Sequence, residues 1–191
     1  MDAALKKAIQ LRGAGKFEES NEILMQLAEE YPDFSLIHYQ CAWSLDLLGK
    51  EAEAVAYYER AIGMGLAGTE LEGALLGLGS TYRTLGAYHK SKEVFLKGIK
   101  LFPKNKAIQT FYAMTLFNLE ELESAMQLLL ECLIETTHDE EIVKYKNAIR
   151  FYSDKLSSHH QLVYAPFALD RSLSLSGMVR FNLRQNSGSI E

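Results

Sequence analysis

Histidine and cysteine are the residues of this sequence that could bind a metal ion or carry out acid–base or nucleophilic chemistry. His38, His89 and His138 are isolated in the sequence, so we interpret them as solvated surface residues. His159 and His160 are adjacent, but no third ligand stands at the spacing of a helix or a metal-binding loop. The sequence therefore predicts no metal site and no cofactor.

The cysteines, glycines and acidic residues form no catalytic pattern either. We expect Cys41 and Cys132 to be small buried hydrophobic residues rather than a redox pair. The glycine cluster in residues 63–79 is not followed by the Gly-Lys-Ser/Thr of a phosphate loop, so close backbone packing explains it better. Gly73 and Gly77 could instead flatten a helix face for a partner. No nucleophile has a base at motif spacing and no carboxylates converge, so we predict that the protein is not an enzyme.

The composition excludes further classes of function. The chain has 191 residues, of which 48% are hydrophobic and 24% charged, as in ordinary globular proteins. Its formal net charge of −5 offers no basic surface to phosphate backbones, so we expect no nucleic-acid partner. No apolar run approaches the roughly 18 residues of a membrane span, and the first residues lack the apolar block of a signal peptide. We expect a cytoplasmic protein without a membrane partner and without a disulfide framework.

Four segments of the chain share one layout. Gly15–Pro32 and Gly86–Pro103 both run from glycine through an aromatic residue and a serine to a proline seventeen residues after the glycine. Gly49–Leu66 is a third copy, in which Ala54 replaces the serine, and Glu120–Thr137 is a weaker fourth. Gly15 and Gly49 are 34 residues apart, and so are Gly86 and Glu120, whereas Gly49 and Gly86 are 37 residues apart. Three extra residues must therefore lie between the copies that begin at Gly49 and Gly86.

This spacing resembles the tetratricopeptide repeat, a helix–turn–helix unit of 34 residues. Small residues at the eighth and twentieth positions let helices A and B of a unit approach closely, and bulky residues at the eleventh and twenty-fourth positions fill the gaps. The small residues are Ala8, Ala42, Gly79 and Ala113, with Ser20, Ala54, Ser91 and Ala125. The bulky residues are Leu11, Leu45, Tyr82 and Leu116, with Leu24, Tyr58, Phe95 and Leu129. We therefore predict an all-α fold, a right-handed superhelical solenoid of these units.

The repeats divide a predicted domain over residues 1–158 into units at about 1–34, 35–68, 72–105 and 106–138. We expect helices near residues 3–13, 17–30, 36–48, 51–63, 71–84, 88–101, 106–118 and 122–135. A ninth helix over 139–156 is expected to cap the last repeat, because a solenoid end needs a polar outer face. Glu120 replaces the turn glycine, so we expect the fourth turn to avoid the left-handed conformation. Residues 159–191 lack the pattern, which favours a disordered tail or sequence foreign to the domain over a strand.

Several blocks resemble a narrower group, the tetratricopeptide repeat group five family of stand-alone proteins from Bacillus-type bacteria. The matching blocks are CAWSLDLLG, GLAG, LEGALLGLGSTYRTLG, AMTLFNL and AMQLLLE, and the resemblance covers about residues 3–157. It implies a bacterial, all-helical superhelix with no catalytic activity that binds proteins, and it leaves a dimer open. The tail after Ser158 lies outside the resemblance.

Positions 2, 5, 9 and 12 of each helix A point to the concave surface of this architecture. They supply the candidate residues of a peptide-binding groove: Arg12, Tyr39, Trp43, Asp46, Leu76, Arg83, Met114 and Phe117. Tryptophan, tyrosine and arginine are the types that anchor interfaces. Alternatively, Tyr39 and Trp43 pack against neighbouring A helices, and the two arginines cap carbonyls or pair with Asp46. The lysine and asparagine with which related chaperone-tail binders clamp a carboxylate are absent from positions 5 and 9.

The leading prediction is a non-catalytic protein–protein interaction module that binds a helical or extended protein segment in an apolar, aromatic groove. One alternative is a secretion-type chaperone for an apolar client segment. Another is a homodimeric scaffold whose groove is buried at the dimer seam. The tail residues Leu162, Val163, Tyr164 and Phe167 could also fold back into the groove.

Overall fold

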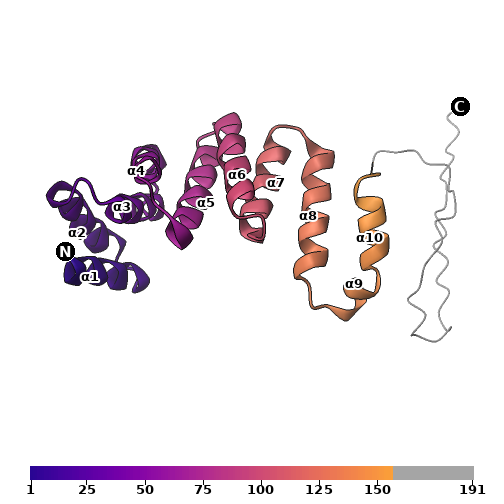
Figure 1. Ribbon diagram of the computed structural model, residues 1–191, viewed down its shortest axis with the longest axis horizontal. Helices are drawn as coiled ribbons and strands as arrows, with labels where there is room; N and C mark the ends of the chain where they lie inside the picture. Colours follow the sequence, from indigo (N-terminus) through magenta and orange to yellow (C-terminus); the bar gives the residue numbers. More distant parts are fainter. Residues whose placement is uncertain (157–191) are drawn as a thin grey trace, which may run out of the picture. The chain divides into compact units, whose positions relative to one another are not determined.

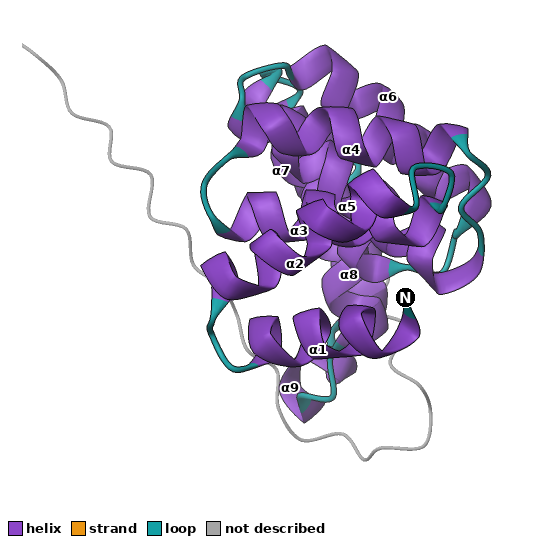
Figure 2. Ribbon diagram, turned by 90° about the vertical axis from the view of Figure 1, so that its left-hand side faces the viewer, coloured by secondary structure: helices purple, strands orange, loops and turns teal. Residues whose placement is uncertain are grey.

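The computed structural model describes residues 1–156, and the elements of this range are all helices (Figures 1 and 2). Four antiparallel helix pairs follow one another along the chain, and two short helices complete the array. The pairs are α1 (Asp2–Gly13) with α2 (Phe17–Glu30), α3 (Ser35–Leu47) with α4 (Glu51–Gly63), α5 (Gly68–Thr84) with α6 (Tyr88–Leu101), and α7 (Lys106–Asn118) with α8 (Leu122–Thr136). The last two helices are α9 (Glu140–Lys144) and α10 (Lys146–Ser153). The predictions for the tail after Ser158 lie outside the described residues.

Small residues hold the two helices of each pair close together. All eight predicted small positions are buried. The Oγ of Ser20 donates a hydrogen bond to the carbonyl oxygen of Ala8 at 2.8 Å, and the Oγ of Ser91 donates to that of Gly79 at 2.7 Å. A larger side chain at either position would force the helices apart. The predicted all-α solenoid is confirmed, because the repeat spacing reappears as regularly packed helix pairs.

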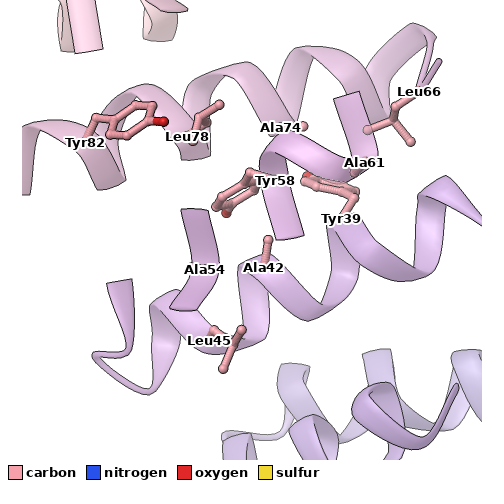
Figure 3. Packing of buried hydrophobic residues seen from close by; sticks show 10 residues of the cluster. All are labelled: Tyr39, Ala42, Leu45, Ala54, Tyr58, Ala61, Leu66, Ala74, Leu78 and Tyr82. Carbon is pink, nitrogen blue, oxygen red and sulfur yellow. The ribbon is translucent and has the colours of Figure 1, made fainter. Parts of the chain in front are cut away.

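The twenty-fourth positions join one pair to the next. Leu24, Tyr58 and Phe95 are almost completely buried, because α3, α5 and α7 pack over the preceding B helices. Figure 3 shows Tyr58 in the middle of the largest apolar cluster, between α3 and α5. The fourth residue of the set, Leu129, is 36% exposed. The end of the array therefore lacks the cover that the inner repeats have.

The three extra residues between the second and third repeats lengthen a helix rather than a loop. Helix α5 begins at Gly68, three residues before the predicted start, and has 17 residues where α3 and α7 have 13. Gly68 adopts a positive φ of 61°, which glycine tolerates without steric cost. The insertion therefore leaves the packing positions of the later repeats in register.

The prediction that residues 139–156 form one continuous capping helix is wrong. The helix divides at Tyr145, whose ψ of 7° departs from the helical value. The amide of Tyr145 donates to the carbonyl of Ile142 at 3.1 Å in a tightened last turn, and the ladder restarts with the amide of Ile149 donating to Tyr145 at 2.9 Å. The resulting bend places α10 along α8 (Figure 1).

The prediction for the fourth turn is also wrong, because Glu120 adopts a left-handed φ of 63°. The equivalent residues Gly15, Gly49 and Gly86 have φ values of 78°, 69° and 74°. The amide of Glu121 donates to the carbonyl of Leu116 at 3.0 Å, the six-residue closure that ends a helix with a left-handed residue. The geometry that joins helix A to helix B therefore overrides the preference of the glutamate.

Candidate functional site

The eight residues predicted for the groove all lie on helix A of a repeat. Helix α3 packs against α5, and α5 packs against α7, so these side chains come from neighbouring helices. They are Arg12 on α1, Tyr39, Trp43 and Asp46 on α3, Leu76 and Arg83 on α5, and Met114 and Phe117 on α7. Direct contacts join Arg12 and Tyr39 to Trp43, whereas Leu76, Arg83, Met114 and Phe117 lie on α5 and α7, two helices that pack against each other.

The first group is built around Trp43. The guanidinium carbon of Arg12 lies 3.9 Å from the centroid of the indole ring, and the Tyr39 ring stacks against it with centroids 6.1 Å apart and planes 29° apart. Trp43 is 43% exposed, whereas Tyr39 is buried in the core cluster. Tyr39 therefore supports the indole from the inside rather than contributing a surface contact of its own.

Arg12 is a largely buried cation on this surface. It is 8% exposed, and its Nη2 donates to the side-chain oxygen of Gln40 at 2.5 Å. Burial lowers the pKa of Arg12 from its ordinary value, and the nearby Tyr39 and Tyr58 act in the opposite direction. Arg12 takes part in none of the ion pairs found in residues 1–156. The indole face and the Gln40 oxygen thus take the place that a carboxylate usually has beside a buried arginine.

Asp46 belongs to a buried polar cluster that joins three helices. The hydroxyl of Tyr58 donates to one of its carboxylate oxygens at 2.8 Å, and the hydroxyl of Thr81 lies 3.0 Å from both. Burial raises the pKa of Asp46, and the hydrogen bonds from Tyr58 and Thr81 counteract this effect. The alternative in which Asp46 pairs with Arg12 or Arg83 is wrong, because no ion pair within residues 1–156 joins Asp46 to either arginine.

Two glycines of α5 allow the tyrosines beneath the surface to fit. A Cβ on Gly73 would collide with the Tyr39 hydroxyl, and a Cβ on Gly77 would collide with the Tyr58 hydroxyl and ring. Both contacts would be closer than any that real Cβ atoms make. Gly73 and Gly77 accordingly serve close packing inside the protein rather than flattening a face for a partner, whereas a Cβ on Gly63 or Gly65 would meet no heavy atom within 4 Å.

The second group lies where α5 meets α7. The Nη1 of Arg83 donates to the side-chain oxygen of Asn118 at 3.2 Å, while its Nε is buried without a hydrogen-bond partner in residues 1–156. Beside Asn118 on α7, Phe117 is 64% exposed, and Met114 one turn earlier is 39% exposed. Leu76 is partly buried two turns before Arg83. Sequence reasoning missed Asn118 and Gln40, because a lone amide carries no motif signal.

Of the isolated histidines, His89 and His138 are exposed as predicted, whereas His38 and the two cysteines lie inside the helix packing. His38 was predicted to be solvated, and this is wrong: it is buried, with Nε2 2.7 Å from the carbonyl oxygen of Pro32. That carbonyl follows the end of α2, where backbone acceptors lack helical partners. Cys41 and Cys132 are buried free thiols, and burial raises the pKa of Cys41 to about 12. Within residues 1–156, no three histidine, cysteine or acidic side chains lie close enough together to hold a metal ion.

Two surface hollows lie away from the eight predicted residues. The larger, of about 470 Å³, is lined by Glu72, Phe102, Pro103, Lys104 and Asn105. The smaller, of about 400 Å³, is lined by Glu18, Asn21, Glu22, Leu48 and Lys50. Neither hollow includes a residue of the Trp43 or Phe117 group. The candidate site is therefore described by its exposed side chains and not by a cavity.

Comparison with protein families matches the repeat pattern along nearly the whole described range. A family described as "Tetratrico peptide repeat" matches residues 35–156, and one described as "Tetratricopeptide repeat" matches residues 2–33. The chain belongs to the tetratricopeptide repeat family. The longer match confirms the predicted group five resemblance. Among curated proteins, none matches this tetratricopeptide repeat protein.

Solved tetratricopeptide repeat structures share its fold. A MamA structure titled "MamA RS-1 ArsTM double mutant" has a TM-score of 0.65 at 14% identity, covering 81% of this chain and 85% of that one. "MamA 41-end from Desulfovibrio magneticus RS-1" gives the same TM-score and identity, covering 80% and 85%. YrrB, titled as a TPR protein with an unusual peptide-binding site, has a TM-score of 0.61 at 14% identity, covering 80% and 77%.

Membership of the tetratricopeptide repeat family sets the general class of function. Repeats of this family form protein-interaction modules, generally without catalysis, and their partners are proteins or peptides. The length and composition of the helices in residues 1–156 are insufficient for any of them to cross a membrane.

Proposed function

We propose that the A-helix face bearing Arg12, Trp43, Arg83, Met114 and Phe117 binds a helical or extended segment of another protein. The observation that carries the proposal is the exposure of three large apolar side chains, Trp43, Met114 and Phe117, on helices of one packed series. Such side chains anchor protein interfaces when a partner covers them, and each contributes through the apolar area that leaves water. We refer to these five residues as the A-helix face.

The charges of the A-helix face suggest what the partner segment contains. Arg83 is partly exposed and takes part in no ion pair within residues 1–156, whereas Arg12 is held by Trp43 and Gln40 and Asp46 by Tyr58 and Thr81. A guanidinium binds carboxylates through paired, charge-assisted hydrogen bonds. We therefore expect the segment to carry acidic side chains next to its large apolar ones.

The proposal is tested by selecting peptides from a random displayed library on the full-length chain. Trp43 is the one tryptophan of the sequence, so its fluorescence reports binding at the A-helix face directly. We expect selected peptides to change this fluorescence and to lose at least about tenfold in affinity for a Phe117→Ala variant, as for a residue that anchors an interface. Leu96→Ala is the matched control, because Leu96 is an exposed apolar residue on the B helix α6.

The outcomes separate the A-helix face from the rest of the surface. Peptides that bind the wild type and the Phe117→Ala variant equally well would contradict the proposal. The proposal would also be contradicted by peptides that bind the Leu96→Ala variant more weakly and whose binding leaves Trp43 fluorescence unchanged. Circular dichroism and thermal unfolding of each variant show whether the fold is intact.

A further inference from the structure

The outer edge of α8 carries a row of large apolar side chains. Leu122, Met126, Leu129 and Leu133 are 36% to 53% exposed. Successive spacings of four, three and four residues keep all four on one narrow side of a helix with about 3.6 residues per turn. We refer to this row as the α8 stripe, and none of the residues predicted for the groove belongs to it.

The inner repeats show that this side of a B helix is built to be covered. Leu129 occupies the position of Leu24, Tyr58 and Phe95, which the A helix of the following repeat buries almost completely. Leu133 occupies the position of Ala28, which is buried, and of Ile62 and Ile99, which are partly buried. The α8 stripe is thus the place where a fifth repeat would lay its first helix.

Helix α10 does not provide this cover. It packs against α8 and buries Ser153, yet the α8 stripe stays exposed beside it. Figure 1 shows α10 running along α8. Phe151 and Tyr152 of α10 are themselves about half exposed and contact each other edge to face. Apolar surface at the end of the described array therefore stays exposed, because α10 covers only part of it.

A second copy of the chain does not fit on the stripe as a fifth repeat. In α3 and α7 the third position of the repeat, Ile37 and Ile108, is completely buried against the preceding B helix. In α1 the third position is Ala3, which is exposed, and the seventh is the exposed cation Lys7. Because α1 has an alanine and a lysine at these two positions, open-ended stacking of copies is disfavoured.

Two copies of the α8 stripe instead match each other when they run in opposite directions. Its spacing of four, three and four residues reads the same in both directions. A two-fold axis between Met126 and Leu129 would place Leu122 against the partner subunit's Leu133 and Met126 against the partner subunit's Leu129. Closed dimers require such a surface, in which one patch matches itself about the axis.

We propose that two copies of this chain form a homodimer by antiparallel pairing of their α8 stripes. The stripe side chains then exchange water for apolar contact, as Leu24, Tyr58 and Phe95, the counterparts of Leu129, do inside the array. This seam differs from a dimer seam in the groove, because it leaves Trp43 and Phe117 uncovered. Each dimer accordingly presents two A-helix faces.

The first test is the mass of the full-length chain by sedimentation equilibrium from about 1 to about 200 µM. We expect the wild type to reach twice the 21.5 kDa of one chain. Met126→Lys is expected to raise the dissociation constant at least about tenfold, because symmetry buries the new charge twice. Leu101→Lys is the matched control, since Leu101 is a similarly exposed leucine on α6. Leu133→Lys serves as a second variant, and circular dichroism checks the fold of each.

The second test is of the pairing direction. In antiparallel pairing the two copies of residue 122 lie about 16 Å apart along the helices, beyond the reach of a disulfide. A Leu122→Cys protein mixed with a Leu133→Cys protein is therefore expected to cross-link under mild oxidation, whereas Leu122→Cys alone is not. The native cysteines Cys41 and Cys132 are buried and do not compete.

Each remaining outcome overturns the proposal. A wild type that stays monomeric at about 200 µM shows that the stripe does not pair. A dimer that persists in both folded lysine variants lies on another surface. A dimer broken by Phe117→Ala and not by Met126→Lys lies in the groove, and Leu122→Cys that cross-links alone means parallel pairing. Peptide binding at Trp43 is measured separately, so the proposed function can fail while the dimer stands, or the reverse.

Discussion

The guanidinium carbon of Arg12 lies over the Trp43 indole ring, 3.9 Å from its centroid. The two residues come from different repeats, and Gln40 on α3 holds the same guanidinium from a second direction. An exposed tryptophan held between Arg12 and Tyr39 loses little further freedom when a partner binds. Such preorganisation reduces the entropic cost of forming an interface.

Replacing Arg12 by methionine tests this support. Methionine keeps much of the side-chain length but loses the cation–π contact and the hydrogen bonds to Gln40. We expect the free energy of unfolding to fall by about 1–2 kcal/mol and Trp43 emission to shift to longer wavelength. Urea unfolding and fluorescence spectra measure both quantities. Arg150→Met, at an exposed position of α10, is the control, and an unchanged Trp43 spectrum in Arg12→Met would show that Arg12 does not hold the ring.

Gly79 is expected to be intolerant of any side chain. A Cβ at this position would lie 2.6 Å from ring atoms of Phe95, which is completely buried and has no room to move. We expect Gly79→Ala to lower the free energy of unfolding by about 1–3 kcal/mol, as in other overpacked cores. Chemical denaturation compares it with Gly13→Ala, where no heavy atom lies within 4 Å. Equal stability of the two variants would contradict the close approach of α5 and α6.

The left-handed Glu120 predicts a stabilising substitution. A non-glycine residue at φ 63° carries a steric cost that glycine avoids. We therefore expect Glu120→Gly to raise the free energy of unfolding by about 0.5–1 kcal/mol, and Gly86→Ala at the equivalent turn to lower it by about 1 kcal/mol. Thermal and urea unfolding of the two variants measure these opposite signs. A loss of stability in Glu120→Gly would mean that the glutamate makes a contribution larger than its strain.

Asp46 predicts a pH dependence with a definite sign. Burial raises the pKa of Asp46 above its ordinary value of 3.8, so the folded state keeps this proton at a higher pH than the unfolded chain. The folded state then binds more protons between the two pKa values, and the contribution of Asp46 to stability falls as the pH rises from about 4 through the raised pKa. We expect the free energy of unfolding of the wild type minus that of Asp46→Asn to decrease over this window and then level off. Urea unfolding from pH 3 to 8 measures the difference, and a rise with pH would contradict the assignment.

The helix pairs were predictable because each depends on residue size at a fixed position. Two helices can approach closely only where both carry small side chains. Small residues at fixed positions of the repeat therefore predict the contacts of Ala8 with Ser20 and of Gly79 with Ser91. Most helix ends were predictable because proline cannot continue a helix and glycine tolerates the left-handed conformation that follows a helix end. The general class of function was predictable because these same residues identify the repeat.

The arrangement of the candidate site was less predictable, because it depends on partners far apart in the chain. Arg12 binds Gln40, 28 residues away, and Thr81 binds Asp46, 35 residues away. Neither pair has a motif spacing, and an arginine or an aspartate alone could point to solvent equally well. Glu120 failed for a related reason: its backbone is set by the turn between two packed helices and not by its own preference.

Packing in the described array is confined to near neighbours. Each of the helices α2 to α7 packs against the helices before and after it, α8 packs against α7 and α10, and the A helices also meet across α3–α5 and α5–α7. Most contacts therefore close short loops, so folding can begin in any helix pair and spread along the chain rapidly. Local opening follows the same rule: α9 and α10 can detach and reattach while the N-terminal pairs stay folded, so we expect amide hydrogen exchange to slow from the ends of the array toward its middle.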